Sequence, residues 1–282
     1  MKRQNQFLLI NANNTNTSFA LANERRIVRV VKVPTAAIRK IPFAVNQYEG
    51  VVLASVVPAA TKKLLHLLKA APGSRLRSSG YATRRNRKGP FSNVLLVNAF
   101  IDLGIDIAYP RRKQIGADRL ANAVGVVRLY GAPAIVVDFG TAVTFDIVKP
   151  STRPESHRGK LRSGACGEYV GGVIAPGLAA VTDYLYQRTA LLPRIRIAEP
   201  RHGGVIGKST VEAMRIGAVV GYRGLVRGIL RALRREHGLK RAVVVATGGY
   251  GKLMAKGIPE IRQVNPLLTL EGLRFIYLRN AK

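Results

Sequence analysis

The sequence predicts an α/β fold of two similar domains, each a mixed sheet flanked by helices, with a ligand cleft between them. Of the 282 residues, 47% are hydrophobic but only 6% are aromatic, and Trp is missing. Cores of Val, Leu, Ile and Ala are typical of sheets that helices cover on both faces. Strand-like and helix-like segments alternate along the chain, and one strand-turn-strand pattern occurs twice. This length suffices for two domains of ordinary size.

The repeated pattern predicts two β-hairpins. The first spans residues 7–22 and the second spans residues 134–148. In each, an apolar strand ends on a polar residue, Asn11 or Asp138, before a turn of small residues and a second strand that contains threonine. The recurrence of this pattern in both halves of the chain indicates that the two domains resemble each other.

The other elements follow in a regular order. An apolar strand is expected over residues 51–57, and Pro58 suits the first turn of the helix after it. The remaining expected elements are a strand at 94–97, a helix at 116–130, a polar surface insert at 151–168, a helix at 208–237, a strand at 241–247 and a helix at 266–279.

This order divides the chain into an N-terminal domain, residues 1–114, and a C-terminal domain, residues 115–282. Each predicted domain contains one of the hairpins. Because ligands of such sheets bind at strand ends and in domain clefts, we expect both hairpin turns to face one cleft.

The charge of the chain is strongly basic, with 46 Lys and Arg against 15 Asp and Glu and a formal net charge of +31. Such a field attracts polyanions and steers anionic small molecules. It could be a nucleic-acid footprint or a solvated exterior around a site for anionic substrates. The basic residues are dispersed and no nucleic-acid-binding signature accompanies them, which favours the second interpretation. The densest run, residues 75–88, is interpreted as a solvated loop.

The single cysteine, Cys166, excludes a disulfide framework and a multi-cysteine metal site within one chain. The apolar run after the basic N-terminus covers only residues 7–10, which is too short for a signal peptide or a membrane span. Together these features predict a cytoplasmic protein with no membrane partner.

The two hairpin turns are the first candidate for chemistry. Turns of small residues let backbone N–H groups and Thr hydroxyls approach phosphate oxygens closely. One such hairpin alone would be an ordinary turn between strands. Two of them, one in each predicted domain, indicate a nucleotide clamp.

An acidic residue at a helix start is the second candidate. Asp118 and Arg119 lie in the first turn of the helix predicted over residues 116–130. A carboxylate there can simply complement the helix dipole. The chain has only six Asp, however, and two of them, Asp118 and Asp138, lie at predicted cleft-facing ends. An Asp-Arg pair suits a kinase, because the carboxylate can take a proton from a hydroxyl while the guanidinium holds an anion.

Seven motifs resemble those of the type III pantothenate kinase family in order and approximate spacing, over nearly the whole chain. They are ASVVP at 54–58, GADR at 116–119, VVDFGTA at 136–142, GGVIAPG at 171–177, STVEAM at 209–214, ATGG at 246–249 and LTLEGL at 268–273. The resemblance implies two actin-like ATPase domains, related to ribonuclease H, with a nucleotide cleft. It also implies ATP-dependent phosphorylation of pantothenate to 4'-phosphopantothenate, the first step of coenzyme A synthesis.

The resemblance further implies Mg²⁺, a monovalent cation (potassium or ammonium) and a homodimer. Carried over motif by motif, Asp118 matches the general base, Asp138 the monovalent-cation ligand and Thr141 an ATP contact. Five residues match positions that bind the substrate pantothenate: Tyr109, Gly116, Ala117, Arg119 and Thr210. The first hairpin turn matches the ATP phosphate loop with Asn11, Ala12, Asn13, Asn14, Thr15, Asn16, Thr17 and Ser18.

This first loop departs from the family pattern Asp-x-Gly-Asn-Thr at two positions. Asn13 replaces the Gly, and Asn is the residue besides Gly that best tolerates a positive φ. Asn11 replaces the Asp that supports the hydrated Mg²⁺ of ATP, so it keeps an acceptor oxygen but loses the negative charge. Loss of such an outer-shell group lowers metal affinity or activity by about 10-fold to 100-fold.

Two hypotheses remain open. In the first, the chain is a working pantothenate kinase, as the intact Asp118, Arg119, Asp138 and Thr210 favour. In the second, it is a catalytically impaired paralogue with a regulatory or nucleic-acid-binding role, as Asn11 and the basic charge favour. We favour the first.

Overall fold

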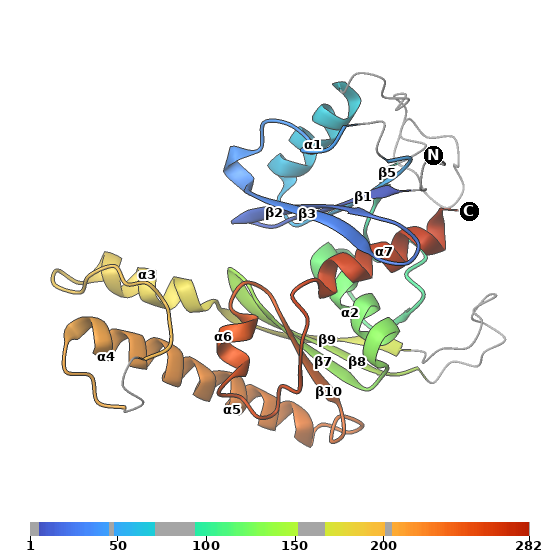
Figure 1. The fold of residues 1–282 in the computed structure, drawn as a ribbon. Helices are drawn as coiled ribbons and strands as arrows, with labels where there is room; N and C mark the ends of the chain where they lie inside the picture. Colours follow the sequence, from blue (N-terminus) through green and yellow to red (C-terminus); the bar gives the residue numbers. More distant parts are fainter. Residues whose placement is uncertain (1–5, 45–47, 71–93, 152–166, 201–204, 282) are drawn as a thin grey trace. The chain divides into compact units, whose positions relative to one another are not determined.

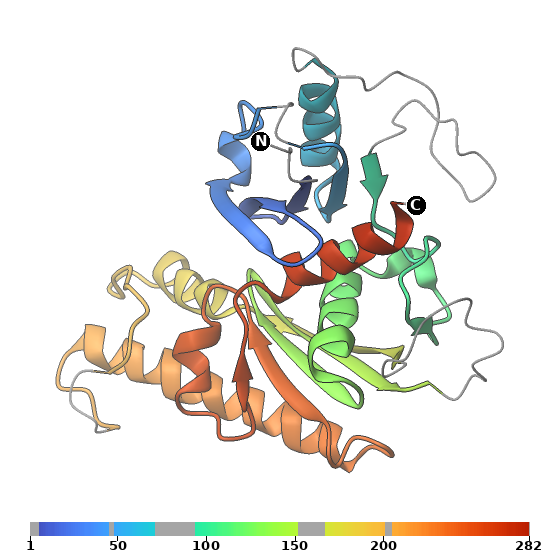
Figure 2. The ribbon, with the colours of Figure 1, turned by 45° about the vertical axis from the view of Figure 1, so that its right-hand side comes forward.

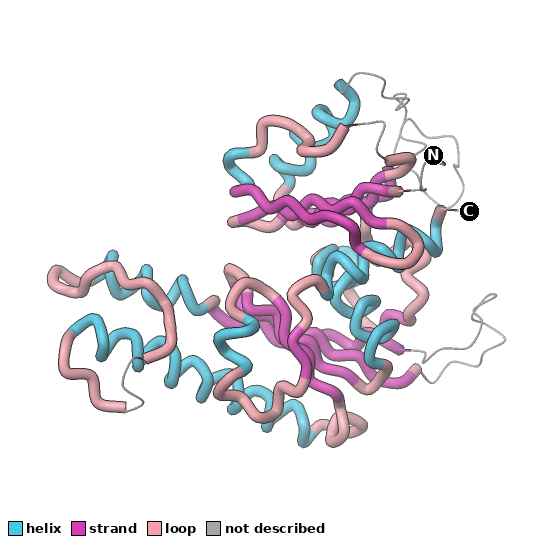
Figure 3. Tube along the Cα trace, viewed as in Figure 1, coloured by secondary structure: helices cyan, strands magenta, loops and turns pink. Residues whose placement is uncertain are grey.

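The structure is a computed structural model that describes residues 6–44, 48–70, 94–151, 167–200 and 205–281. It contains two mixed sheets flanked by helices, so the predicted α/β class is confirmed (Figures 1 and 3). The described residues form two compact units. The first unit takes its residues from 1–129, 151–169 and 267–282, and the second from 130–150 and 170–266. The predicted boundary between residues 114 and 115 lies inside the first unit, and the domain assignment stays a prediction.

The first unit has a five-stranded sheet in the order β3-β2-β1-β4-β5. Its strands are β1 (Phe7–Ala12), β2 (Asn16–Ala22), β3 (Ile27–Pro34), β4 (Val51–Ser55) and β5 (Val94–Leu96). Strands β1, β2 and β3 form an antiparallel meander, whereas β4 runs parallel to β1 and β5 runs parallel to β4. The predicted first hairpin is therefore confirmed. Leu64 and Leu68 of helix α1 (Pro58–Ala70) are buried in a hydrophobic core, where they pack with apolar residues of this sheet.

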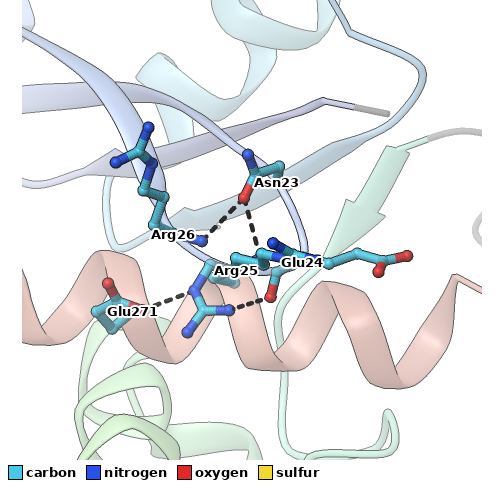
Figure 4. A network of polar contacts seen from close by, with 6 residues as sticks. Asn23, Glu24, Arg25, Arg26 and Glu271 are labelled. Atoms are coloured by element: carbon cyan, nitrogen blue, oxygen red, sulfur yellow. Dashed lines mark hydrogen bonds and ion pairs between the residues drawn. The ribbon is translucent and has the colours of Figure 1, made fainter. Parts of the chain in front are cut away.

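The C-terminal helix α7 (Leu268–Asn280) belongs to this first unit and contacts several of its parts. The Tyr277 ring stacks on Phe7 of β1, with 4.0 Å between the ring centroids. Arg274 pairs with Glu271 at 2.7 Å and donates to the Glu24 carbonyl at 2.6 Å, which joins α7 to the turn between β2 and β3. Its two partners, Glu271 and Glu24, are labelled in Figure 4. The last helix thus stabilises the sheet that carries the first hairpin.

Helix α2 (Ala117–Tyr130) packs closely against α7. A Cβ on Gly272 would lie 1.8 Å from the Ala121 carbonyl oxygen, so this crossing leaves no space for a side chain there. Beside it, Thr269 donates to the buried Asn122 at 2.7 Å. The predicted helix at 116–130 is confirmed. Its contacts with α7 fix its position within the first unit.

The second unit is built on the strands β11-β10-β7-β8-β9, and the two-residue β6 (Asp106–Ile107) pairs with the start of β9 in the first unit. The strands are β7 (Ala134–Phe139), β8 (Ala142–Pro150), β9 (Gly167–Pro176), β10 (Val243–Thr247) and β11 (Gln263–Val264). Strands β7 and β8 form the predicted second hairpin, and β10 runs parallel to β7. Ile135, Val137 and Phe139 of β7 pack in one core with Val226 and Leu230 of helix α5 (Tyr222–Arg235).

The helices of the second unit are α3 (Leu178–Arg188), α4 (Thr210–Ile216), α5 (Tyr222–Arg235) and α6 (Gly251–Ala255). A π-helical turn, Gly217–Gly221, joins α4 to α5, so the helix predicted at 208–237 exists as one run of three parts (Figure 2). Helix α3 and strand β3 were not predicted. Among the described residues, no helix is at once long and apolar enough to cross a membrane.

Two predicted surface segments fall largely outside the described residues. The basic run at 75–88 lies there entirely, as do Cys166 and most of the insert at 151–168. The insert prediction was wrong at its end, because Gly167 and Glu168 already belong to strand β9. Glu168 pairs there with Asp106 of β6, which lies 62 residues earlier in the sequence. A local sequence pattern cannot reveal such a pairing.

Candidate functional site

The predicted phosphate loop is the turn of the first hairpin. The eight predicted residues occupy the end of β1, the turn and the start of β2, with Asn11 opposite Ser18 and Ala12 opposite Thr17. The turn closes through a hydrogen bond from the Asn13 N–H to the Asn16 carbonyl, at 3.0 Å. Asn14 and Thr15 are exposed at its tip. The structure thus brings all eight residues together in one tight turn.

The amide that replaces the family's carboxylate is buried. Asn11 is only 7% exposed, and within the described part of the chain its Oδ1 atom has no hydrogen-bond partner. Asn13 Oδ1 is likewise buried and has no hydrogen-bond partner among the described residues. A buried acceptor without a partner costs free energy, so these two oxygens are suited to a donor that a ligand supplies.

A hydrated divalent cation fits this requirement, since its bound waters are hydrogen-bond donors. Mg²⁺ usually keeps several waters and is bound through substrate phosphates together with one or two protein groups. Among the described residues, no group of three or more His, Cys, Asp and Glu could hold a metal by itself. The residues present therefore fit an ion that ATP carries in and Asn11 contacts through water.

The second hairpin presents a carboxylate at the matching place. Asp138 is the second-last residue of β7, opposite Thr144 of β8 and beside Thr247 of β10. The backbone of Gly248 passes behind it with φ +83°, and a Cβ there would lie 2.4 Å from Asp138 Oδ1. Only glycine satisfies both conditions, which explains the glycine of the ATGG motif. Thr141, the predicted ATP contact, is exposed in the turn of this hairpin.

The predicted base lies in the first turn of α2. Gly116 precedes the helix, and a Cβ there would lie 2.6 Å from Asp118 Oδ1, so the loop passes close to the carboxylate. The Arg119 N–H donates to the same oxygen at 2.8 Å. Burial raises the pKa of Asp118, and the Arg119 N–H and guanidinium oppose this only in part. A carboxylate of raised pKa is a better proton acceptor, as a general base requires.

Three predicted substrate residues lie in the same unit as this carboxylate. Ala117 is buried at the helix start, and the Arg119 guanidinium lies 5.9 Å from the ring centroid of Tyr169. The Tyr109 ring contacts the same tyrosine, with 6.2 Å between centroids. Tyr169 therefore brings Arg119 and Tyr109 together, although the sequence analysis missed it. Its one signal was an aromatic residue in an apolar segment, which is more typical of a core.

Thr210, the last predicted substrate residue, lies exposed in the second unit as the first residue of α4. Ser209 caps this helix by accepting from the Glu212 N–H at 3.2 Å. The Ser-x-x-Glu spacing is that of a capping box. The STVEAM motif thus forms a helix start that holds the Thr210 hydroxyl at the surface.

Comparison with known proteins gives the family of this fold and site. Residues 7–232 match the sequence profile of the type III pantothenate kinase family. A type III pantothenate kinase of Akkermansia muciniphila is 42% identical over 274 residues, which cover 95% of this chain and 96% of that protein. A protein of the same name from Methylacidiphilum infernorum is 38% identical over 275 residues, covering 95% of this chain and 87% of the relative.

Among solved structures, the chain is similar to one from Campylobacter jejuni described as a Baf family transcriptional activator. The TM-score is 0.55 and the identity 16%, with 97% of this chain and 98% of the other covered. At this identity the likeness concerns the fold alone, and it extends over both units.

Proposed function

Since this chain belongs to the type III pantothenate kinase family, we propose that it transfers the terminal phosphoryl group of ATP to the hydroxyl of pantothenate, forming 4'-phosphopantothenate for coenzyme A synthesis. The observation that carries the proposal beyond the family name is Asp118. This half-buried carboxylate of raised pKa lies at a helix start beside Gly116 and Arg119, and the Arg119 guanidinium contacts the Tyr169 ring.

In this proposal Asp118 accepts the proton of the attacking hydroxyl. Arg119 holds the pantothenate carboxylate, and the contacts of Arg119 and Tyr109 with Tyr169 limit the positions these two side chains can take. Gly116 and Ala117, at the same helix start, would contact the substrate as well. The exposed hydroxyl of Thr210, in the second unit, is proposed as a further pantothenate contact. Phosphoryl transfer depends mainly on positioning and charge stabilisation, so fixed groups of this kind are what the reaction requires.

The metal assignments belong to the same proposal. Asn11 would accept hydrogen bonds from waters of the Mg²⁺ that ATP carries, and Asp138 would hold a potassium or ammonium ion. Bound cations neutralise the charge that develops on the phosphates. The buried acceptor oxygen of Asn11 supports the assignment of Mg²⁺. The Asp138 carboxylate, against which the Gly248 backbone packs, supports the assignment of the monovalent ion.

We also propose that the enzyme is a homodimer that uses an apolar face of the second unit. Several large apolar side chains there are exposed, among them Leu191 at 90% and Ile206 at 84%. Exposed apolar side chains of this size mark interaction sites where they gather into a patch. On the helix run from α4 to α5, four glycines have open space where a Cβ would stand and recur every three or four residues: Gly217, Gly221, Gly224 and Gly228. A second helix could approach such a stripe closely.

A Gly224→Gln variant tests the dimer. Gln favours a helix more than Gly by roughly 0.5 kcal/mol, so the single subunit should become slightly more stable, whereas the longer side chain should separate the two copies. We expect sedimentation analysis to show monomers. The matched control is Ala70→Gln at the exposed end of α1. A dimer of unchanged affinity in Gly224→Gln would contradict this choice of face.

A cytoplasmic location is proposed with the activity, because ATP is the phosphoryl donor. No observation in the described residues favours the alternative of an impaired paralogue with a regulatory or nucleic-acid-binding role. Nucleic acid therefore remains a disfavoured partner.

The activity is tested by measuring ADP release with ATP, pantothenate and Mg²⁺, with and without potassium. Asp118→Asn should lower kcat by about 100-fold to 10,000-fold, the usual contribution of general base catalysis. It should leave ATP binding intact, because Asp118 is not in either hairpin. Asp102→Asn, at an exposed aspartate paired with Arg279, is the matched control. Pantothenate-dependent turnover that persists in Asp118→Asn would exclude this carboxylate as the base.

A further inference from the structure

Resting on the proposed function, we propose that Thr35 is a positioning residue for the ATP phosphate loop: it holds the turn between β1 and β2 in its nucleotide-binding shape and so sets the affinity for ATP. Thr35 follows the last residue of β3 and opens a short 3-10 turn, Thr35–Ala37. It belongs to no motif of the sequence analysis, and it lies 18 to 22 residues beyond its partners in the loop.

Three hydrogen bonds join Thr35 to the loop. Its hydroxyl donates to the Asn13 carbonyl at 2.6 Å, and its N–H donates to the Thr15 carbonyl at 3.0 Å. Its hydroxyl oxygen also lies 3.0 Å from the hydroxyl oxygen of Thr17. Because a hydroxyl has one proton and that of Thr35 is given to Asn13, the Thr17 hydroxyl must be the donor of this last bond.

These hydrogen bonds engage every second residue of the loop, Asn13, Thr15 and Thr17, so they fix its shape. Thr17 is fully buried, so its hydroxyl is a fixed hydrogen-bond partner for the hydroxyl of Thr35. The two carbonyl oxygens that Thr35 engages, those of Asn13 and Thr15, are electronegative groups that would repel a phosphate if they faced it. Hydrogen bonding to Thr35 holds them in place, which keeps the loop suited to an anion.

The positioning role of Thr35 is especially important in this chain, because the phosphate loop lacks the glycine and the aspartate of the family pattern. Asn13 stands where the family has Gly, and it is the residue whose carbonyl Thr35 binds. A loop pre-formed in its bound shape loses less conformational entropy on binding, and preorganisation of this kind raises affinity. Removal of the Thr35 hydroxyl should therefore weaken binding of ATP specifically.

Thr35→Val is the direct test, because Val replaces the hydroxyl with a methyl group and keeps the backbone N–H. This substitution removes two of the three hydrogen bonds, the one to the Asn13 carbonyl and the one from the Thr17 hydroxyl, and should raise the KM for ATP about threefold to tenfold. The Kd for a non-hydrolysable ATP analogue, titrated by calorimetry without pantothenate, should rise equally. The KM for pantothenate should stay unchanged. Thr35→Ser, which retains the hydroxyl, should restore most of the ATP affinity.

The matched control is Thr61→Val in helix α1, which removes a hydroxyl bonded to the Val57 carbonyl at 3.1 Å in the same unit. If Thr35→Val bound the analogue as tightly as Thr61→Val, or if its KM values for both substrates rose in step with a lower Tm, the inference would be overturned. Should Thr35→Val fail to fold, a Thr35→Ser variant of native Tm but unrestored ATP affinity would also overturn it.

The proposed function can fail separately. If the wild type bound the analogue and Thr35→Val weakened this binding, but no pantothenate were phosphorylated, the inference would stand and the proposed function would fall. If the wild type bound no nucleotide, both would fall.

Discussion

The two hairpins of this chain share one design but differ in charge. In each, a buried strand carries a polar residue at its second-last position, Asn11 in β1 and Asp138 in β7, opposite a hydroxyl residue of the second strand. Asn11 is neutral and buried, and in the described residues its acceptor oxygen is without a hydrogen bond. Asp138 is anionic and half-buried, with glycine backbone behind it.

The two turns are also shaped by different means. The first is held by the hydroxyl and N–H of Thr35, which directly follows β3, and the second is backed by Gly248, which directly follows β10. In the proposed function this difference would separate two roles: the charged second turn would hold a bare monovalent ion, and the neutral first turn would accept hydrogen bonds from the waters of a hydrated ion. The carboxylate attracts a cation directly, whereas the amide can only accept from its waters.

The largest effect is expected when the second turn is made as neutral as the first. Asp138→Asn should lower kcat by about 100-fold and abolish activation by potassium, since loss of a group that supports a metal costs up to this factor. Activity measured against potassium concentration checks this, with Asp102→Asn as control. An Asp138→Asn enzyme that potassium still activates would show that the ion binds elsewhere.

The backbone behind Asp138 should be the next most sensitive position. Gly248→Ala places a Cβ in a left-handed conformation and 2.4 Å from a carboxylate oxygen, so it should lower the free energy of unfolding by about 1–3 kcal/mol. Gly249→Ala is the neighbouring control, because a Cβ there meets nothing within 4 Å. Urea denaturation measures both. Equal stability of the two variants would mean that the second turn is not held by close packing.

The converse change gives the first turn a charge. Asn11→Asp should raise the affinity for Mg²⁺ in the presence of ATP about 10-fold. Without metal, the same variant should have a lower Tm at pH 7, because a buried unpaired carboxylate is costly. Mg²⁺ activation curves and thermal unfolding with and without Mg²⁺ and ATP test both effects. An Mg²⁺ affinity that did not change would refute the water-mediated contact.

A smaller effect, on stability, is expected from the other carboxylate of the proposed site, Asp118. Burial raises its pKa in the folded protein, so the folded state binds the proton more tightly than the unfolded state, and stability falls as the pH rises through this range. Asp118→Asn removes the ionised group and should therefore give a Tm at pH 7 equal to or above that of the wild type. Below the ordinary carboxyl pKa of 3.8 the difference should vanish. A variant that is less stable at pH 7 would contradict this sign.

The sequence predicted those parts of the site whose signals are local. Both hairpins, the start of α2 and the run from α4 to α5 were recognisable, because turn residues and helix periodicity lie within a few positions. Thr35 and Tyr169 were not, since each acts on residues far away in the sequence. The place of α7 in the first unit was equally hidden, because its packing on Phe7 and Ala121 depends on tertiary contacts.

The most direct test of the account is label transfer from ATP labelled at its terminal phosphate, with the wild-type chain, Mg²⁺, potassium and pantothenate. We expect labelled phosphopantothenate to form, which would show that Asn11 supports phosphoryl transfer in place of the family's aspartate. Label transfer by Asn11→Asp but none by the wild type, at saturating Mg²⁺, would contradict the account.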